Sequence, residues 1–284
     1  MPELQRDRAR LQYLRRGRGP AVLLIQGSGV PARGWQPQIE GLADRFDLIA
    51  FDNPGIGGST FTGPSPTIES MAADALAITD AEECERFHVV GHSMGGLIAQ
   101  QIALTAPERV RSLALLCTFA RGPQAARLSL AMVVTALRIY VGTRPMRRQA
   151  FTELVMPAPY LASVDRAALG RQLSDLFERD LANQPAIAMT QLKAMAKYDA
   201  FGRLASLGSI PTLVAAAAYD RIALPAYGRE LAAAIPGARY IELADGGHAV
   251  TIQCAEQINA LLAEHFSSVE AAQTSGLKSG ATEC

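Results

Sequence analysis

The stretch Gly91-His92-Ser93-Met94-Gly95-Gly96 decides the fold of this chain. It follows the apolar run Phe87-His88-Val89-Val90, which is typical of a strand buried on both faces of a parallel sheet, and it leads into a helical pattern over residues 94–105. Gly-x-Ser-x-Gly between a strand and a helix indicates a sharp turn, in which a Cβ at either glycine would collide with the neighbouring strand or helix. The turn exposes the Ser93 hydroxyl above the sheet, where the following helix aims backbone N–H groups at a developing negative charge.

The same alternation of strands and helices extends outward from this turn. Apolar runs bounded by turn residues predict further strands at residues 21–25, 48–51, 110–116, 212–216 and 239–243. Helical patterns at residues 68–82 and 252–265 belong to the same alternation. Strands that alternate with helices favour a parallel α/β sheet.

The pattern changes between about Phe119 and Leu204, where no strand is predicted. Helices are predicted at residues 126–140, 145–155, 165–180 and 186–197, separated by Pro and Gly. The near-continuous apolar stretch from Leu128 to Tyr140 predicts a helix that is covered on one side by the core domain and on another by neighbouring helices or a pocket.

These patterns define the expected domains. Residues 1–118 and 205–266 are predicted to form a core domain, and residues 119–204 a helical insertion. The tail, residues 267–284, is rich in Ser, Gly, Thr and Ala, which predicts disorder.

Composition excludes several classes of function. Lys plus Arg and Asp plus Glu number 27 each, so the formal net charge is zero and offers no global field for nucleic acid or an acidic membrane. The N-terminal residues lack the apolar core of a signal peptide, and the longest apolar stretches are too short to span a bilayer. We expect a cytoplasmic monomer or homodimer that acts on a small molecule and binds neither nucleic acid nor membrane. The four cysteines, at positions 84, 117, 254 and 284, lack the spacing of a metal or redox motif, so we expect free thiols and no metal site.

A serine hydroxyl is a poor nucleophile until a base takes its proton. Among the four histidines, His248 follows the flexible Asp245-Gly246-Gly247 after the last predicted strand, above the carboxyl edge where open α/β sheets place their ligands. We predict His248 as the general base of Ser93. Asp220 follows the strand at residues 212–216, and we predict that it fixes the tautomer of the imidazole.

The chain resembles the α/β-hydrolase superfamily over about residues 11–266. The resemblance is carried by Ser93, Asp220 and His248 in this chain order, with Gly27-Ser28-Gly29 and the turn at residues 52–59. It implies a mostly parallel eight-stranded sheet flanked by helices, with a helical lid inserted after the sixth strand. Within the superfamily the chain is most similar to small lidded esterases, such as the antibiotic methylesterases and the enol-lactonases.

An acyl-transfer site also needs two donors for the tetrahedral oxyanion. One is predicted to be the N–H of Met94, directly after the nucleophile. The other should come from the loop after the first predicted core strand, where many family members have His-Gly and this chain has Gln26-Gly27-Ser28. We predict the Ser28 N–H, with Gly27 as the alternative. Gln26 either orients this loop through its amide or is simply tolerated there.

The substrate pocket is expected to involve Gln26, Trp35, Tyr140 and Tyr198, with Trp35 favoured as a core residue beside the pocket. The implied chemistry is hydrolysis, without a cofactor, of a small and largely apolar ester, lactone or related carbonyl substrate through an acyl-enzyme. Two alternatives stay open. One is a non-catalytic ligand-binding protein on the same fold, and the other is a carbon–carbon bond hydrolase. The latter is disfavoured because Ala249 follows His248, where related enzymes usually have Trp.

Overall fold

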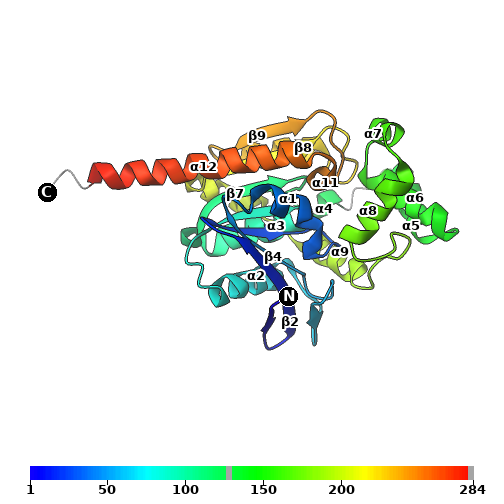
Figure 1. Cartoon of the computed structure of the whole chain (residues 1–284), viewed down its shortest axis with the longest axis horizontal. Helices are drawn as coiled ribbons and strands as arrows, with labels where there is room; N and C mark the ends of the chain where they lie inside the picture. The colour runs from blue at the N-terminus through cyan, green and yellow to red at the C-terminus, as the bar shows by residue number, and fades with distance from the viewer. Residues whose placement is uncertain (126–129, 281–284) are drawn as a thin grey trace.

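The computed structural model describes residues 1–125 and 130–280, and its strands form one sheet (Figure 1). The strands are β1 (Glu3–Gln5), β2 (Ala9–Gly17), β3 (Ala21–Ile25), β4 (Asp47–Phe51), β5 (Thr60–Phe61), β6 (Phe87–His92), β7 (Val110–Leu116), β8 (Thr212–Ala217) and β9 (Arg239–Leu243). Their spatial order is β1-β2-β4-β3-β6-β7-β8-β9, with the two-residue β5 paired to β2 off this path. The pairings of β1 with β2 and of β2 with β4 are antiparallel, and those from β4 to β9 are parallel. The predicted mostly parallel, eight-stranded sheet is confirmed, and β5 adds a ninth strand.

Helices cover both faces of this sheet (Figure 1). One face carries α2 (Ile68–Ala81), α3 (Met94–Thr105) and α10 (Pro225–Ala234), and the other carries α1 (Gln36–Leu42) and α12 (Ala255–Gly280). Short helices η1 (Ala32–Trp35), η2 (Pro107–Arg109) and α11 (Val250–Gln253) lie in the connections. Successive side chains of a strand point to opposite faces, so Leu23 and Ile25 of β3 pack under α2 and α3, whereas Leu24 packs on the opposite side. This explains why the core strands read as continuous apolar runs.

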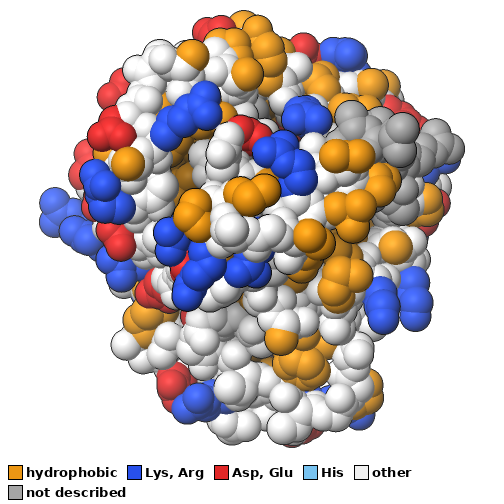
Figure 2. Space-filling view, turned by 90° about the vertical axis from the view of Figure 1, so that its right-hand side faces the viewer, with side chains coloured by type: hydrophobic (Ala, Val, Ile, Leu, Met, Phe, Trp, Pro, Cys, Tyr) orange, Lys and Arg blue, Asp and Glu red, His pale blue; other side chains and the backbone are white. Residues whose placement is uncertain are grey.

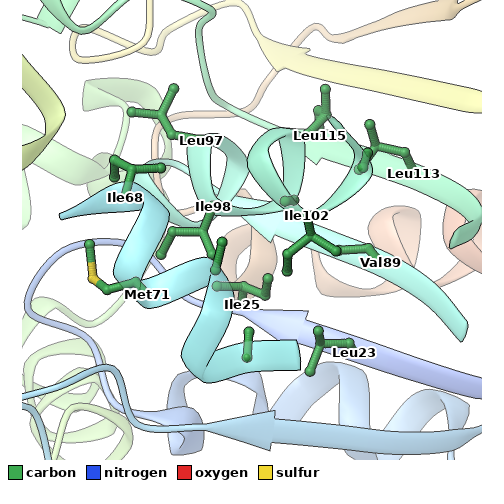
Figure 3. Packing of buried hydrophobic residues seen from close by; sticks show 14 of the residues in the cluster. Leu23, Ile25, Ile68, Met71, Val89, Leu97, Ile98, Ile102, Leu113 and Leu115 are labelled. Carbon is green, nitrogen blue, oxygen red and sulfur yellow. The ribbon is translucent and has the colours of Figure 1, made fainter. Parts of the chain in front are cut away.

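Figure 3 shows the first of these layers from close by. Ile98 and Ile102 of α3 point toward the sheet, Ile98 beside Ile25 and Ile102 beside Val89, and all four side chains are fully buried. Burying each such side chain contributes about 1.5–3 kcal/mol. The helix that follows Ser93 is therefore anchored on the sheet along its whole length.

Between β7 and β8 the described chain consists of helices joined by turns, with one isolated bridge, Arg121 with Asp199, which joins the two ends of the insertion. Its helices are α4 (Gly122–Ala125), α5 (Leu130–Tyr140), α6 (Arg144–Val155), α7 (Ala158–Ser163), α8 (Arg166–Leu176), α9 (Ala188–Lys197) and η3 (Phe201–Ser209). The four predicted helices correspond to α5, α6, α8 and α9, and α4, α7 and η3 were not predicted. The expected start of the first helix, at residues 126–129, lies outside the described residues. Figure 1 shows α5 to α8 gathered at one end of the sheet.

The prediction that the apolar helix α5 is covered on two sides is wrong for the described part of its surface. Val134 and Leu137 are 50% and 57% exposed, and Tyr140 is 51% exposed. The helix packs against α6, which accounts for the buried Ile139. Leu128 lies outside the described residues. Over residues 1–125 and 130–280, no helix is both long enough and apolar enough to cross a membrane.

The prediction of a disordered tail is wrong for most of its length, because α12 continues through Gly280 and projects beyond the sheet (Figure 1). Two contacts extend the helix past Phe266. Val269 is buried, and the Glu270 carboxylate accepts two hydrogen bonds from Arg111 of β7 at 2.7 and 2.9 Å. Residues 281–284, with Cys284, lie outside the described residues.

Candidate active site

The sequence-predicted turn between β6 and α3 places Ser93 in strained backbone geometry. Its φ is 54° and its ψ is −119°, which an L-residue rarely adopts. The two glycines of the motif make this turn possible. A Cβ on Gly95 would lie 2.0 Å from the Ile25 carbonyl oxygen, and one on Gly91 would lie 2.3 Å from the Gly95 carbonyl oxygen. The Thr118 hydroxyl donates to the Ser93 carbonyl at 2.7 Å, which ties the turn to the end of β7.

His248 reaches Ser93 from the loop that follows β9. Its Nε2 lies 2.9 Å from the Ser93 Oγ, and its Nδ1 lies 2.8 Å from the Asp220 Oδ2. The helical insertion holds this loop in place, because the Ala249 N–H donates to the Val155 carbonyl at 3.0 Å. The structure therefore brings together the three residues that the sequence predicted, with spacings that suit proton transfer from Ser93 to His248.

Asp220 is held in the orientation that the imidazole needs. It is 2% exposed, and its Oδ1 accepts hydrogen bonds from the N–H groups of Ile222 at 2.8 Å and Ala223 at 2.9 Å. This leaves Oδ2 for His248. The neighbouring Cys117 is also buried, and burial, followed by the charge of Asp220, raises the pKa of its thiol well above the ordinary value. Cys117 therefore stays protonated beside the carboxylate.

The loop after β3 approaches Ser93 from the other side. A Cβ on Gly27 would lie 3.0 Å from the Ser93 Cβ, so glycine lets the loop come this close. The Gly27 N–H already donates to the Gln26 Oε1 at 3.0 Å, which favours Ser28 over Gly27 as the second oxyanion donor. Met94 is the first residue of α3, where N–H groups have no acceptor within the helix.

Gln26 and His92 connect this loop to the loop of the base. Gln26 is 2% exposed, and the same Oε1 lies 3.2 Å from the His92 Nδ1. The His92 Nε2 donates to the His248 carbonyl at 2.8 Å, and burial lowers the pKa of His92 to about 3, so the ring is neutral. With the proton on Nε2, the Nδ1 can only accept, so its contact with the Gln26 Oε1 is not a hydrogen bond. Of the two roles left open for Gln26, the contacts favour orientation of the loop.

The structure places two of the four expected pocket residues, Trp35 and Tyr198, in the core and a third, Tyr140, on the surface of the insertion. Trp35 is 0% exposed within the core cluster beneath α1 and α12, as a core residue would be. Tyr198 is buried, and its hydroxyl donates at 3.1 Å to Gln101, two turns along α3 from Ser93. Tyr140 is about half exposed on α5. These side-chain directions follow from the packing of the insertion, which periodicity alone does not specify.

One contact at the site was missed by the sequence reasoning. Gln191 of α9 is 0% exposed, and its Oε1 accepts hydrogen bonds from the Ser28 hydroxyl at 2.9 Å and the Gly29 N–H at 3.0 Å. A single glutamine on a helix carries no pattern that marks such a role.

Two of the three arginines near the start of α6 are paired with one carboxylate. Arg144 and Arg148 both donate to the Asp180 carboxylate, at distances between 2.6 and 3.1 Å. Hydrogen bonds from Arg148, from the Ala182 N–H and from Arg144, in this order of importance, hold the pKa of Asp180 below its usual range. Both guanidinium groups are thus paired within the lid.

Comparison with known proteins agrees with this geometry. A family model described as alpha/beta hydrolase fold matches residues 20–253. The RutD protein of Azorhizobium caulinodans, whose provisional name is carbamate hydrolase, is 32% identical over 92% of this chain and 97% of that protein. The enol-lactonase from Burkholderia xenovorans LB400 is similar with a TM-score of 0.79 and 25% identity, over 94% of this chain and 100% of that chain. A thermophilic esterase from Thermogutta terrifontis shares the fold with a TM-score of 0.76 at 23% identity, over 92% of this chain and 94% of that chain. The chain therefore belongs to the α/β-hydrolase family, and the protein is a hydrolase.

Proposed function

We propose that this protein is a cofactor-free serine hydrolase that cleaves a carboxylic ester, a lactone or a related carbonyl substrate through an acyl-enzyme. One observation carries the proposal, namely the continuous path from the Ser93 Oγ to the His248 Nε2 at 2.9 Å and from the His248 Nδ1 to Asp220 at 2.8 Å. A nucleophile beside a base that a third group orients is the arrangement of nucleophilic acyl transfer.

The proposed reaction has two halves. In the first, the Ser93 Oγ bonds to the carbonyl carbon while His248 Nε2 takes the hydroxyl proton, and the oxyanion receives hydrogen bonds from the N–H groups of Met94 and Ser28. The bond to the leaving group then breaks, and His248 returns the proton to that group. In the second half, His248 takes a proton from water, the hydroxide attacks the acyl carbon, and Ser93 leaves with the proton.

A carbamate is a second candidate substrate of the same machinery. It is favoured by the 32% identity to the RutD protein, whose provisional name is carbamate hydrolase. A carbamate carbonyl passes through the same tetrahedral oxyanion, so the triad alone does not discriminate between the two substrate classes. The contacts of the lid set this preference.

The proposal favours small, uncharged and largely apolar substrates. Arg144 and Arg148 are both bonded to the Asp180 carboxylate, which holds the two guanidinium groups within the insertion and compensates part of their charge. The insertion also presents apolar side chains on α9, where Met189 and Leu192 are 53% and 43% exposed beside the buried Gln191. Each methylene added to the acyl group should raise kcat/KM by up to about fourfold, equivalent to about 0.8 kcal/mol, until the pocket is full.

The test is turnover of a matched panel, which contains aryl esters from acetyl to octanoyl, a lactone, an aryl carbamate and a carbon–carbon bond substrate. Wild type should turn over at least one ester, lactone or carbamate, and Ser93→Ala should lower that rate by about 10⁴-fold or more. Ser206→Ala removes an exposed hydroxyl that donates to Arg203, and should match wild type. No turnover by wild type would favour the ligand-binding alternative, and turnover of the carbon–carbon substrate alone would favour that hydrolase. A preference for acetyl with steady loss on lengthening would contradict the apolar pocket.

A further inference from the structure

One amide oxygen of the lid binds the loop after β3, which lies beside the candidate nucleophile Ser93. Gln191 projects from α9, and its Oε1 accepts both the Ser28 hydroxyl at 2.9 Å and the Gly29 N–H at 3.0 Å. A second lid residue reaches the same loop, because the Arg179 Nη2 donates to the Gly29 carbonyl at 3.4 Å. The loop is therefore fixed from above by the insertion as well as from below by the sheet.

The orientation of the Gln191 amide follows from its partners. A backbone N–H can only donate, so the atom that faces Gly29 must be the acceptor Oε1. The Nε2 end is then left buried, without a hydrogen-bond partner among the described residues. Burying an N–H group without an acceptor is unfavourable. The Gln191 side chain therefore accepts the hydrogen bonds of the loop while its own NH₂ group stays without an acceptor among the described residues.

The two bonds restrain the segment that would hold the oxyanion. The Ser28 hydroxyl and the N–H of the following peptide, at Gly29, are both hydrogen-bonded to Gln191. Gly29 has a φ of +73°, and the Val30 N–H approaches the Gly27 carbonyl at 3.4 Å, as in a tight turn that needs glycine at this position. Residues in such a turn can reorient by rotation of one peptide group. An external acceptor that binds both Ser28 and Gly29 restrains that rotation.

We infer that Gln191 is a positioning residue through which the lid sets the direction of the Ser28 N–H toward the oxyanion. The inference rests on the proposed function, since it assigns a role within that site. Gln191 acts through Ser28, and its effect belongs to the transition state, where the oxyanion exists. Loss of the amide should therefore lower kcat while KM changes little.

The experiment compares Gln191→Met with wild type, using the best aryl ester and an aryl boronic acid. The boron atom accepts the Ser93 oxygen and forms a tetrahedral adduct that imitates the intermediate. We expect a loss of about tenfold or more in kcat and a parallel weakening of boronic acid affinity, because a whole oxyanion donor is worth about 10²- to 10³-fold. Gln184→Met is the matched control, since its amide donates to Leu181 within the lid and should leave both quantities unchanged.

A double-mutant cycle separates positioning from a general loss of lid stability. Ser28→Ala removes one of the two bonds, so Ser28→Ala with Gln191→Met should be no worse than Gln191→Met alone. Additive losses, a change confined to KM, or a folded Gln191→Met within twofold of wild type in kcat and boronic acid affinity would each overturn the inference. A wild-type enzyme that forms no covalent adduct at Ser93 would instead overturn the proposed function, so the two failures are distinguishable.

Discussion

The catalytic loops and the lid are built on different principles. Around Ser93, elements approach so closely that only glycine fits, as the 2.0 Å from a Gly95 Cβ to the Ile25 carbonyl oxygen shows. The lid instead packs around Leu173 in a small cluster that also includes Ala249 of the core domain, and it leaves large apolar side chains exposed, among them Leu137 at 57% and Val141 at 66%. Figure 2 shows the face of the molecule at the end where the lid lies, and on it hydrophobic side chains are interspersed with Lys and Arg. The core therefore tolerates little change in shape, whereas the lid surface can vary.

The same comparison shows where hydrogen bonds connect the lid to the loops around Ser93. The Val155 carbonyl holds the loop of His248, and Gln191 holds the loop of Ser28. Both contacts join the lid to a loop at the carboxyl edge of the sheet. The residues of the proposed reaction thus lie at strand ends, and a few hydrogen bonds connect them to the lid.

The largest contrast is expected between two aspartates. Asp220→Asn should lower kcat by up to about 10⁴-fold, because an amide does not hold the imidazole in the required tautomer. Asp180→Asn in the lid removes the partner of Arg144 and Arg148 but touches no group of the triad, so kcat should change by less than about threefold. Steady-state kinetics with the preferred ester measures both. A wild-type rate for Asp220→Asn would mean that another carboxylate orients His248.

The next contrast concerns packing of the catalytic turn. Gly95→Ala forces a Cβ to within 2.0 Å of a backbone oxygen, so the sheet and helix must separate. We expect loss of more than about 4 kcal/mol in the free energy of unfolding, at the exceptional end of single substitutions. Urea denaturation, or the soluble yield if the variant does not fold, is the readout. Near-normal stability would show that the turn relaxes more easily than its geometry indicates.

Within the lid, buried and exposed leucines should behave differently. Leu173 is 0% exposed in the lid core, and Leu173→Ala should cost about 2–5 kcal/mol in unfolding free energy. Leu137→Ala, on the exposed surface of α5, should fall within about 0.5 kcal/mol of wild type. Equal effects at the two positions, measured by urea denaturation, would mean that α5 is covered.

Mild acid should destabilise the core rather than the lid, because the buried His88, His92 and His265 lie in the core, whereas the lowered pKa of Asp180 keeps the paired lid carboxylate charged there. Burial lowers the pKa of His88 and His92 to about 3 and that of His265 to about 4. The unfolded chain binds protons on these rings below about pH 6.5, where the folded chain does not, so stability is complete above that pH and falls as pH decreases. From about pH 7 to about pH 5.5, unfolding free energy should fall by about 1 kcal/mol for each ring. His265→Gln should flatten this slope in urea titrations, and an unchanged slope would contradict the assignment.

The smallest effect is expected at a lid glycine that has room for a side chain. Gly170 lies inside α8, and a Cβ there would have no neighbour within 4 Å. Gly170→Ala should therefore stabilise the protein by up to about 1 kcal/mol, with the opposite sign to Gly95→Ala. A destabilised Gly170→Ala would show that the surroundings of α8 are tighter than described.

The same contrast explains what sequence reasoning could reach. Strands 21–25, 110–116 and 239–243 were predicted to the residue, because apolar runs between turn residues mark buried parallel strands. The positions of Ser93, Asp220 and His248 followed from local motifs at strand ends. The pocket residues stay a prediction, because the direction of Tyr140 or Tyr198 depends on how the lid helices pack together. The end of α12 was missed because Val269 and Glu270 make long-range contacts that the surrounding Ser and Ala hide.

The central claim is that Ser93 is a nucleophile activated by His248, and covalent labelling tests it most directly. Wild type treated with an aryl fluorophosphonate should gain one adduct, and peptide mapping should place it on the segment that holds Ser93. His248→Ala should label much more slowly, and Ser93→Ala should not label at all. An adduct at another residue with loss of activity, or an active enzyme that resists the reagent, would contradict the account.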